Sequence, residues 1–295
     1  MPSWKGKSRG GAIGYRFFIF LITKLGIKFA YTFLVFVIIH FVPFAPAATK
    51  AAYLFYRKGF RYSLFKTIGM IFVNYYRFGQ ILIDRIAVKS KLADKYRYEF
   101  DNYEHFLSVL NGGTGVIMIG AHVGNWEVGG SFFGEYSNKI NIVMYDAEYQ
   151  KIKDVLEKNT DKIPYKVIPV SEQDFEHIYR IKDALDAKEY VCFQGDRFIS
   201  DKKSYTFDFF GKNAKFPAGP FYLADKYNVP IVFYFSMREK GMKYRFIFRV
   251  AEPASEGEKS SDAAYRLAQQ YVNVLEDIVK KYPEQWFNYY KFWDV

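Results

Sequence analysis

The sequence of 295 residues is poor in the residues that build covalent staples and metal centres. It has a single cysteine, Cys192, which excludes an internal disulfide framework. Its four histidines (His40, His105, His122 and His177) form no H-E-x-x-H pair, and without paired cysteines a zinc site is not expected. A G-x-S-x-G elbow is also missing, which disfavours a serine hydrolase. We therefore expect no metal and no cofactor.

Acidic residues are scarce in the first third of the chain. Residues 1–100 hold 17 Lys and Arg against 3 Asp and Glu, whereas residues 101–295 hold 25 against 28. Half of all residues are hydrophobic and 21% are aromatic, a composition that suits contact with lipid or with an apolar ligand. Because the cations flank apolar runs and do not line a polar face, the pattern favours an anionic membrane surface over nucleic acid.

One run of 21 residues, 29–49, contains no Lys, Arg, Asp or Glu. It is long enough to cross a bilayer as a helix, but Pro43 and Pro46 weaken its second half. Basic residues on both sides leave its orientation open, and a segment that dips into one leaflet fits equally well. The stretch "FAPAA" also matches a signal-cleavage site, although the long basic region before it argues against cleavage. We expect residues 1–98 to form a helical region attached to the membrane.

From residue 99 onward, short apolar runs alternate with amphipathic stretches, which predicts an α/β domain over residues 99–295 with a largely parallel central sheet flanked by helices. Strands are expected at 115–120, 140–146, 165–170, 190–196, 230–237 and 242–250. Helices are expected at 124–135, 148–159, 173–187, 217–228 and 261–281. Functional side chains in such sheets gather beyond the carboxyl ends of the strands.

The stretch "IGAHVGNWEVGG" (119–130) places His122 two residues beyond one expected strand. Asn125 is a plausible N-cap for the next helix, and Glu127 would lie in its first turn, where the helix dipole favours a negative charge. A carboxylate there can accept one ring N–H of the histidine and leave the other nitrogen as a base. An ordinary histidine beside a helix-starting glutamate is the alternative, and spacing alone does not decide between them.

Two further clusters are expected near the same rim of the sheet. The stretch "FQGDRF" places Asp196 and Arg197 after another strand, either as a structural ion pair or as groups that hold a phosphate or stabilise an oxyanion. The stretch "FFGKNAKFPAGPFYLA" (209–224) combines an aromatic–glycine turn with Lys215 and a helix start at Gly219, whose free N–H groups would face this rim. A tight loop before a helix is the alternative there.

Several of these stretches together resemble one bacterial enzyme family. The sequences "AHVGNWE", "GDR", "FDFFGKNAKFPAGPFYLA", "NVPIVFYF" and the closing "PEQWFNYYKFW" are similar to those of the late acyltransferases of lipid A biosynthesis, the lauroyl and myristoyl transferases of the lysophospholipid-acyltransferase-like group. The resemblance spans about residues 10–293. The H-x4-D/E motif is short, but its order with the FFG and P-x-G-P stretches is specific.

The resemblance implies transfer of a fatty acyl chain from an acyl-carrier-protein thioester to a hydroxyl of an envelope lipid, at the cytoplasmic face of the cell inner membrane. It implies His122 as general base and Glu127 as the carboxylate that orients it. The residues expected to bind substrate are Asn125, Trp126, Asp196, Arg197, Lys215 and Gly219. Because the donor is cytosolic, an anchor that keeps the active site on the cytoplasmic side is favoured.

One departure from the family pattern leaves the acceptor open. Well-known members carry a Tyr-Arg pair after the second strand, whereas this chain reads Met144-Tyr145-Asp146. The opening "WKGKSRGGAIGYRFF" is similar to members associated with other envelope products, such as aryl polyene or flexirubin-type pigments. Acylation of a pigment or of a lysophospholipid is therefore the alternative to a lipid A precursor. A catalytically inactive, membrane-binding homologue is a third hypothesis.

Overall fold

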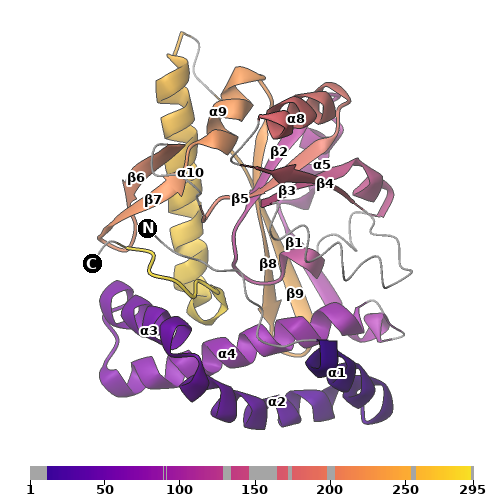
Figure 1. Cartoon of the computed structure of the whole chain (residues 1–295). Coiled ribbons are helices and arrows are strands. Elements are labelled where there is room, and N and C mark those ends of the chain that lie inside the picture. Colours follow the sequence, from indigo (N-terminus) through magenta and orange to yellow (C-terminus); the bar gives the residue numbers. More distant parts are fainter. Residues whose placement is uncertain are drawn as a thin grey trace.

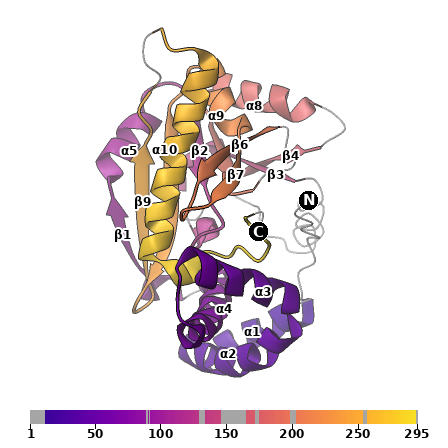
Figure 2. The same cartoon turned by 90° about the vertical axis from the view of Figure 1, so that its left-hand side faces the viewer.

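A computed structural model describes residues 12–293 except 89, 91, 129–133, 146–164, 172–174, 198–202 and 254–256. Helices α1 to α4 lie together as a layer at one end of a β-sheet with its own flanking helices (Figure 1). The same layer is seen from the side in Figure 2, again beneath the strands. The arrangement matches the predicted combination of an N-terminal helical region and an α/β fold.

The central sheet has seven strands in the order β1-β9-β8-β2-β5-β3-β4. Their bounds are Arg97–Asp101 (β1), Val116–Gly120 (β2), Ile140–Tyr145 (β3), Lys166–Val170 (β4), Tyr190–Gln194 (β5), Ile231–Glu239 (β8) and Lys243–Val250 (β9). Neighbouring strands run parallel except β8 and β9, which are antiparallel. The largely parallel sheet is thus confirmed, and all five residues of the central strand β2 are buried.

Helices pack on the sheet, and all but the first of those described fall where a helix was expected. The described ones are α5 (Tyr103–Leu110), α8 (Glu176–Asp186), α9 (Gly219–Lys226) and α10 (Ser260–Lys281). Tyr271 of α10 is fully buried, and its hydroxyl donates to the Gly120 carbonyl at 2.8 Å, which fixes α10 against the end of β2. Of the expected helix at 124–135, Trp126–Val128 form a helical turn and residues 129–133 lie outside the described residues, as does the helix expected at 148–159.

Sequence patterning did not predict β1, α5 or a hairpin formed by β6 (Ser204–Asp208) and β7 (Asn213–Pro217). Strand β1 reads RYEFD and lies at a sheet edge, so it has no continuous apolar run. Its acidic residues instead pair with Arg245 of β9, as in the 2.9 Å contact from Asp101. The hairpin turns at Phe210 and Gly211, both with positive φ, which is the expected aromatic–glycine turn; the strands on either side of it were not expected.

The N-terminal layer consists of α1 (Ala12–Lys24), α2 (Ile27–Phe41), α3 (Pro46–Leu54) and α4 (Leu64–Ala87). The uncharged run at 29–49 is not one helix, because Pro46 disfavours helical backbone at Ala45, whose φ is −118° and ψ 55°. In the described part of the chain one helical stretch, Ile27–Phe44, is long and apolar enough to span a membrane by length and composition.

Helix α4 joins this layer to the rest of the fold. The Asn74 amide donates to the backbone carbonyls of Glu284 and Trp286, both at 3.1 Å, so α4 is bonded to the segment that follows α10. Buried apolar residues form one continuous cluster from Leu21 to Trp293. The boundary expected between residues 98 and 99 falls inside β1, and the division of the chain into two regions stays a prediction.

Gly124 allows the segment after β2 to cross strand β8 at close range. Its φ is +63°, and a Cβ added there would lie 2.1 Å from the Ser236 carbonyl oxygen. Gly113 also has a positive φ, +78°, but nothing lies within 4 Å of its added Cβ. Alanine at Gly113 therefore introduces backbone strain alone, whereas alanine at Gly124 introduces the same strain and a steric clash.

We expect Gly124→Ala to lower the free energy of unfolding by at least about 2 kcal/mol more than Gly113→Ala, which bears only the left-handed strain of about 1–2 kcal/mol. Urea unfolding followed by tryptophan fluorescence measures the difference. Equal effects of the two substitutions would show that the crossing at Ser236 is not close-packed.

Candidate active site

The register of two neighbouring strands brings His122 and Asp196 together. Strands β2 and β5 run parallel with Gly120 opposite Gln194, so the residues two positions beyond each strand meet at the same rim. The His122 ring Nδ1 lies 2.8 Å from Asp196 Oδ1, and the His122 backbone N–H donates to Oδ2 at 3.0 Å. The expected common rim for these two residues is therefore present.

The Asp196 carboxylate is enclosed and fully hydrogen-bonded. Its side chain is 2% exposed, and Trp286 Nε1 donates to Oδ2 at 3.2 Å. Burial by itself raises the pKa of Asp196, but the electrostatic interaction and hydrogen bond with His122, with help from Arg197 and Trp286, outweigh it and lower the pKa to about 2. Asp196 is therefore an anion, and an anionic carboxylate only accepts hydrogen bonds.

That anion fixes the tautomer of the histidine. Because Asp196 Oδ1 can only accept, His122 Nδ1 carries the proton and donates it to the carboxylate. The lone pair of the neutral ring then resides on Nε2, to which no residue in the described part of the chain hydrogen-bonds. The His122 side chain is 23% exposed. The site therefore presents a ring nitrogen that can accept a proton from a bound molecule.

Glu127 has a different partner from the one expected. Its Oε1 lies 2.8 Å from Arg85 Nη1, near the end of α4, and the Arg85 guanidinium lies 5.9 Å from the Trp126 ring. The helical turn at Trp126–Val128 thus directs Glu127 toward α4. The carboxylate that holds the His122 ring is Asp196, whereas Glu127 was expected in that place. A catalytic role for Glu127 itself stays a prediction.

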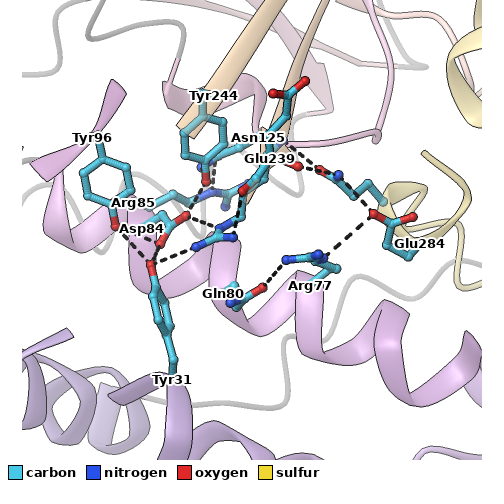
Figure 3. A network of polar contacts seen from close by, with 12 residues as sticks. Tyr31, Arg77, Gln80, Asp84, Arg85, Tyr96, Asn125, Glu239, Tyr244 and Glu284 are labelled. Atoms are coloured by element: carbon cyan, nitrogen blue, oxygen red, sulfur yellow. Dashed lines mark hydrogen bonds and ion pairs between the residues drawn. The ribbon is translucent and has the colours of Figure 1, made fainter. Parts of the chain in front are cut away.

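Asn125 is an internal anchor of the same segment. Its side chain is fully buried, Nδ2 donates to the Tyr244 hydroxyl at 3.2 Å, and Oδ1 accepts from Arg85 Nε at 3.3 Å (Figure 3). Its backbone N–H donates to the Ser236 carbonyl at 2.8 Å. The side chain is thus engaged with α4 and β9 and does not serve as the expected helix cap, and its role in substrate binding stays a prediction.

The other expected binding residues are placed less centrally. The Arg197 guanidinium lies 5.8 Å from the Tyr290 ring. Lys215 lies in β7 opposite Thr206, and Gly219 begins α9. Neither Lys215 nor Gly219 is among the residues that hold His122 and Asp196 together, so their roles stay predictions. Asp146, the departure from the family pattern, lies outside the described residues.

The segment after α10 completes the site, and its place there was not predicted. Trp286 pairs with Val123 in an antiparallel bridge, and the Phe287 N–H donates to the His122 carbonyl at 2.9 Å. The Tyr290 hydroxyl donates to the Asp196 backbone carbonyl at 3.0 Å. One sequence signal was available, namely the density of Trp and Tyr in "QWFNYYKFW", since buried Trp and Tyr require partners for their polar tips.

An apolar hollow adjoins this segment. It lies between α3 and the residues after α10, and its empty volume of about 280 Å³ includes open solvent. Its walls are Ala51, Leu54, Phe55, Trp286, Asn288, Tyr290, Lys291, Phe292 and Trp293. Trp286 and Tyr290 also bind Asp196, so the hollow and the His122–Asp196 pair share two side chains.

An imidazole held by a buried carboxylate beyond the strand ends of an α/β sheet is typical of hydrolases and group-transfer enzymes. Comparison with known sequences narrows this class. The family model for bacterial lipid A biosynthesis acyltransferases matches residues 63–294, from the N-cap of α4 onward. The chain belongs to that family, and the family name indicates an acyltransferase.

Curated relatives carry a similar name. The chain is 24% identical over 138 residues to a phosphatidylinositol mannoside acyltransferase of Mycobacterium tuberculosis, covering 45% of this chain and 42% of the relative. It is 22% identical over 125 residues to the protein of that name from Mycolicibacterium smegmatis, covering 41% of this chain and 40% of the relative. The chain spans less than half the length of these relatives. The resemblance to the acyltransferase family is thus confirmed.

The depressed pKa of Asp196 makes a pH-dependent contribution to stability. A folded-state pKa of about 2, below the ordinary 3.8, stabilises the fold above about pH 4, and this contribution is lost as the pH falls toward 2. We expect wild type to lose about 2 kcal/mol more unfolding free energy than Asp196→Asn between pH 5 and pH 2. Chemical denaturation across this range measures it, with Asp183→Asn on the exposed face of α8 as the control for loss of one charge. If the difference in unfolding free energy between wild type and Asp196→Asn stays constant from pH 5 to pH 2, the low pKa of Asp196 is contradicted.

Proposed function

We propose that this protein transfers a fatty acyl chain from an acyl-carrier-protein thioester to a hydroxyl of an envelope lipid resembling a lipid A precursor. The observation that carries the proposal is the His122 ring, whose Nδ1 is held by Asp196 and whose Nε2 accepts no hydrogen bond from the described residues. Membership of the lipid A biosynthesis acyltransferase family supports the reaction class. The side chains that the site shares with an apolar hollow support an apolar substrate.

The proposed reaction requires a general base and a fixed arrangement of that base, the attacking hydroxyl and the thioester. A thioester is already activated, so the attacking hydroxyl needs only to lose its proton as its oxygen bonds to the acyl carbon. His122 Nε2 takes that proton, and the Asp196 carboxylate stabilises the imidazolium that forms. The tetrahedral intermediate then collapses, the carbon–sulfur bond breaks, and the imidazolium returns the proton to the departing thiolate. No covalent bond to the protein and no metal or cofactor enters this sequence.

Glu127 enters the proposal as a second carboxylate on the same short segment. Its charge is balanced by Arg85, and its side chain is 32% exposed, so it is accessible to a substrate in a way that Asp196 is not. In this scheme Asp196 orients the histidine, and Glu127 with Arg85 borders the acceptor. The relative effects of substituting the two carboxylates test the division of roles.

The proposed acceptor follows from a chemical feature shared by the lipids that the family and its relatives are named after. Lipid A and phosphatidylinositol mannoside, the molecules in the names of the family and of the relatives, are both lipids that carry sugar hydroxyls. A glycolipid hydroxyl is therefore the leading acceptor. A lysophospholipid or an aryl polyene or flexirubin-type pigment is the alternative, and lipid profiling of a strain lacking the gene separates them by which acylated product disappears.

We place the protein on the cell inner membrane, with the active site facing the cytoplasm. Thirteen of the eighteen large hydrophobic side chains that are exposed in the described residues lie between residues 17 and 82. They are Phe17, Phe20, Leu25, Phe29, Val35, Phe36, Ile39, Phe44, Leu64, Phe65, Ile68, Val73 and Leu82, which we call the apolar face. An exposed apolar area of this kind with basic residues around it supports attachment to an anionic bilayer. Because the proposed acyl donor is a cytosolic carrier protein, the active site would then face the cytoplasm.

We expect His122→Ala to lower kcat/KM about 10²–10⁴-fold, the range for loss of a general base. The assay measures thiol release from lauroyl- and palmitoyl-acyl carrier protein in the presence of membrane lipid extract. His105→Ala, on the exposed surface of α5, is the matched control and should keep wild-type turnover. Near-full activity of His122→Ala would refute the mechanism, and an inactive wild type would favour the membrane-binding homologue without turnover.

The same assay separates the two carboxylates. Asp196→Asn should lower kcat with little change in KM for the thioester, because it disturbs the orientation and tautomer of His122. Glu127→Gln should act mainly on KM for the lipid acceptor. A loss of kcat in Glu127→Gln that exceeds the loss in Asp196→Asn would return the orienting role to Glu127.

We expect the double variant Phe36→Asp/Phe65→Asp to bind phosphatidylethanolamine–phosphatidylglycerol vesicles at least about tenfold more weakly than wild type, because two apolar contacts become charged. Co-sedimentation with vesicles measures the change. Phe175→Asp/Tyr179→Asp alters two other largely exposed aromatic residues outside the apolar face and should bind as wild type does. Equal loss in the two double variants would contradict the placement of the membrane surface.

A further inference from the structure

A buried ion pair lies where helix α4 meets strand β8. Asp84 of α4 is 0% exposed and Arg238 of β8 is 4% exposed, and Arg238 Nε donates to Asp84 Oδ2 at 2.8 Å. Figure 3 shows that side chains from several elements converge on this carboxylate. The pair is separate from the His122–Asp196 contact and takes no part in the proposed proton transfer.

Three tyrosine hydroxyls also donate to Asp84. Tyr96 donates to Oδ1 at 2.8 Å, Tyr244 of β9 donates to Oδ2 at 2.5 Å, and Tyr31 of α2 donates to Oδ1. Arg238 Nη2 in turn donates to the Tyr31 hydroxyl oxygen at 3.2 Å. Burial and the charge of Asp84 raise the pKa of Tyr244 well above its ordinary value, so its hydroxyl stays protonated and keeps donating.

The network continues to the segment that carries the candidate catalytic residues. The Tyr244 hydroxyl donates to Asp84 and accepts from Asn125 Nδ2 at 3.2 Å, so one hydroxyl joins Asn125 to the ion pair. Asn125 lies three residues after His122 and two before Glu127. Arg85, adjacent to Asp84 on α4, binds both Asn125 Oδ1 and Glu127. The segment is thus held on this side by two successive residues of α4.

Stability alone does not account for a buried charge pair at this place. Replacing such a pair by apolar residues of similar volume is often neutral or stabilising, because the desolvation cost of two charges offsets most of their attraction. A buried pair does specify direction, since its hydrogen bonds form in one arrangement only. The arrangement here connects α2, α4, β8, β9 and the segment after β2.

We propose that Asp84 and the groups bonded to it are positioning residues, which hold the segment from His122 to Glu127 in place and tie that placement to helix α2. Tyr31 is the member that belongs to α2, and its helix also carries Phe36 and Ile39 of the apolar face. The seating of α2 against lipid is therefore connected by hydrogen bonds to the segment beside the base. The kinetic part of this inference rests on the proposed acyl transfer.

The test removes single hydroxyls from the full-length protein in detergent micelles. Tyr244→Phe breaks the bond between Asn125 and Asp84, and Tyr31→Phe breaks the bond to α2. Tyr190→Phe is the matched control, because its buried hydroxyl donates to the Leu110 carbonyl at the opposite end of β5 from Asp196. Hydrogen–deuterium exchange of residues 122–128 reports their placement without any need for turnover.

We expect Tyr244→Phe to raise amide exchange over residues 122–128 about tenfold, with a smaller rise in Tyr31→Phe, and to lower kcat about tenfold with KM for the acyl thioester within about twofold of wild type. Tyr190→Phe should leave both quantities at wild-type values even if its melting temperature falls. If Tyr244→Phe does not fold, Tyr31→Phe decides the question.

Exchange and kcat that match Tyr190→Phe in both network variants would overturn the inference and leave the pair as a plain link between α4 and the sheet. A wild type without turnover would refute the proposed function but not this inference, because the exchange measurement then decides it alone.

Discussion

The parallel register of β2 and β5 is the constraint on which the candidate site depends. With Gly120 opposite Gln194, the chain delivers a histidine and an aspartate to one point two residues beyond the sheet. A shift of one residue would turn the side chains of one strand to the opposite face, and the imidazole would lose its carboxylate. The buried apolar residues of β2 and β5 set this register, so the packing of the core and the geometry of the site are the same property of the sequence.

Helix α4 has apolar side chains on its outer side and polar side chains toward the candidate site. Its outward side chains, such as Leu64, Phe65 and Val73, belong to the apolar face, whereas its inward Asn74, Asp84 and Arg85 bond to the site and its supports. An amphipathic helix normally divides water from a protein core. Here the polar side is the buried one at several positions, which is the pattern expected if lipid and not water lies on the other side.

Much of the fold could be predicted because its signals are local. The strands are short apolar runs of the right length, and the placement of His122 and Asp196 beyond two of them follows from strand ends alone. The partner of the histidine could not be predicted in this way, because Asp196 lies 74 residues from His122 and meets it only through the pairing of β2 with β5, whereas Glu127 lies five residues along the chain. The choice between them depends on Arg85, which lies about forty residues before Asn125 and draws Glu127 toward α4. The same holds for Trp286 and the hairpin of β6 and β7, whose places are set by contacts between segments far apart in sequence.

The crossing of Trp286 and Tyr290 over Asp196 has a consequence for the order in which the protein becomes competent. Trp286 lies 90 residues after Asp196, so during synthesis the whole sheet can form before the carboxylate receives its indole N–H. Until then water has access to Asp196, and the histidine is held less firmly. A nascent chain can therefore carry all seven strands of the sheet before the His122–Asp196 pair is enclosed.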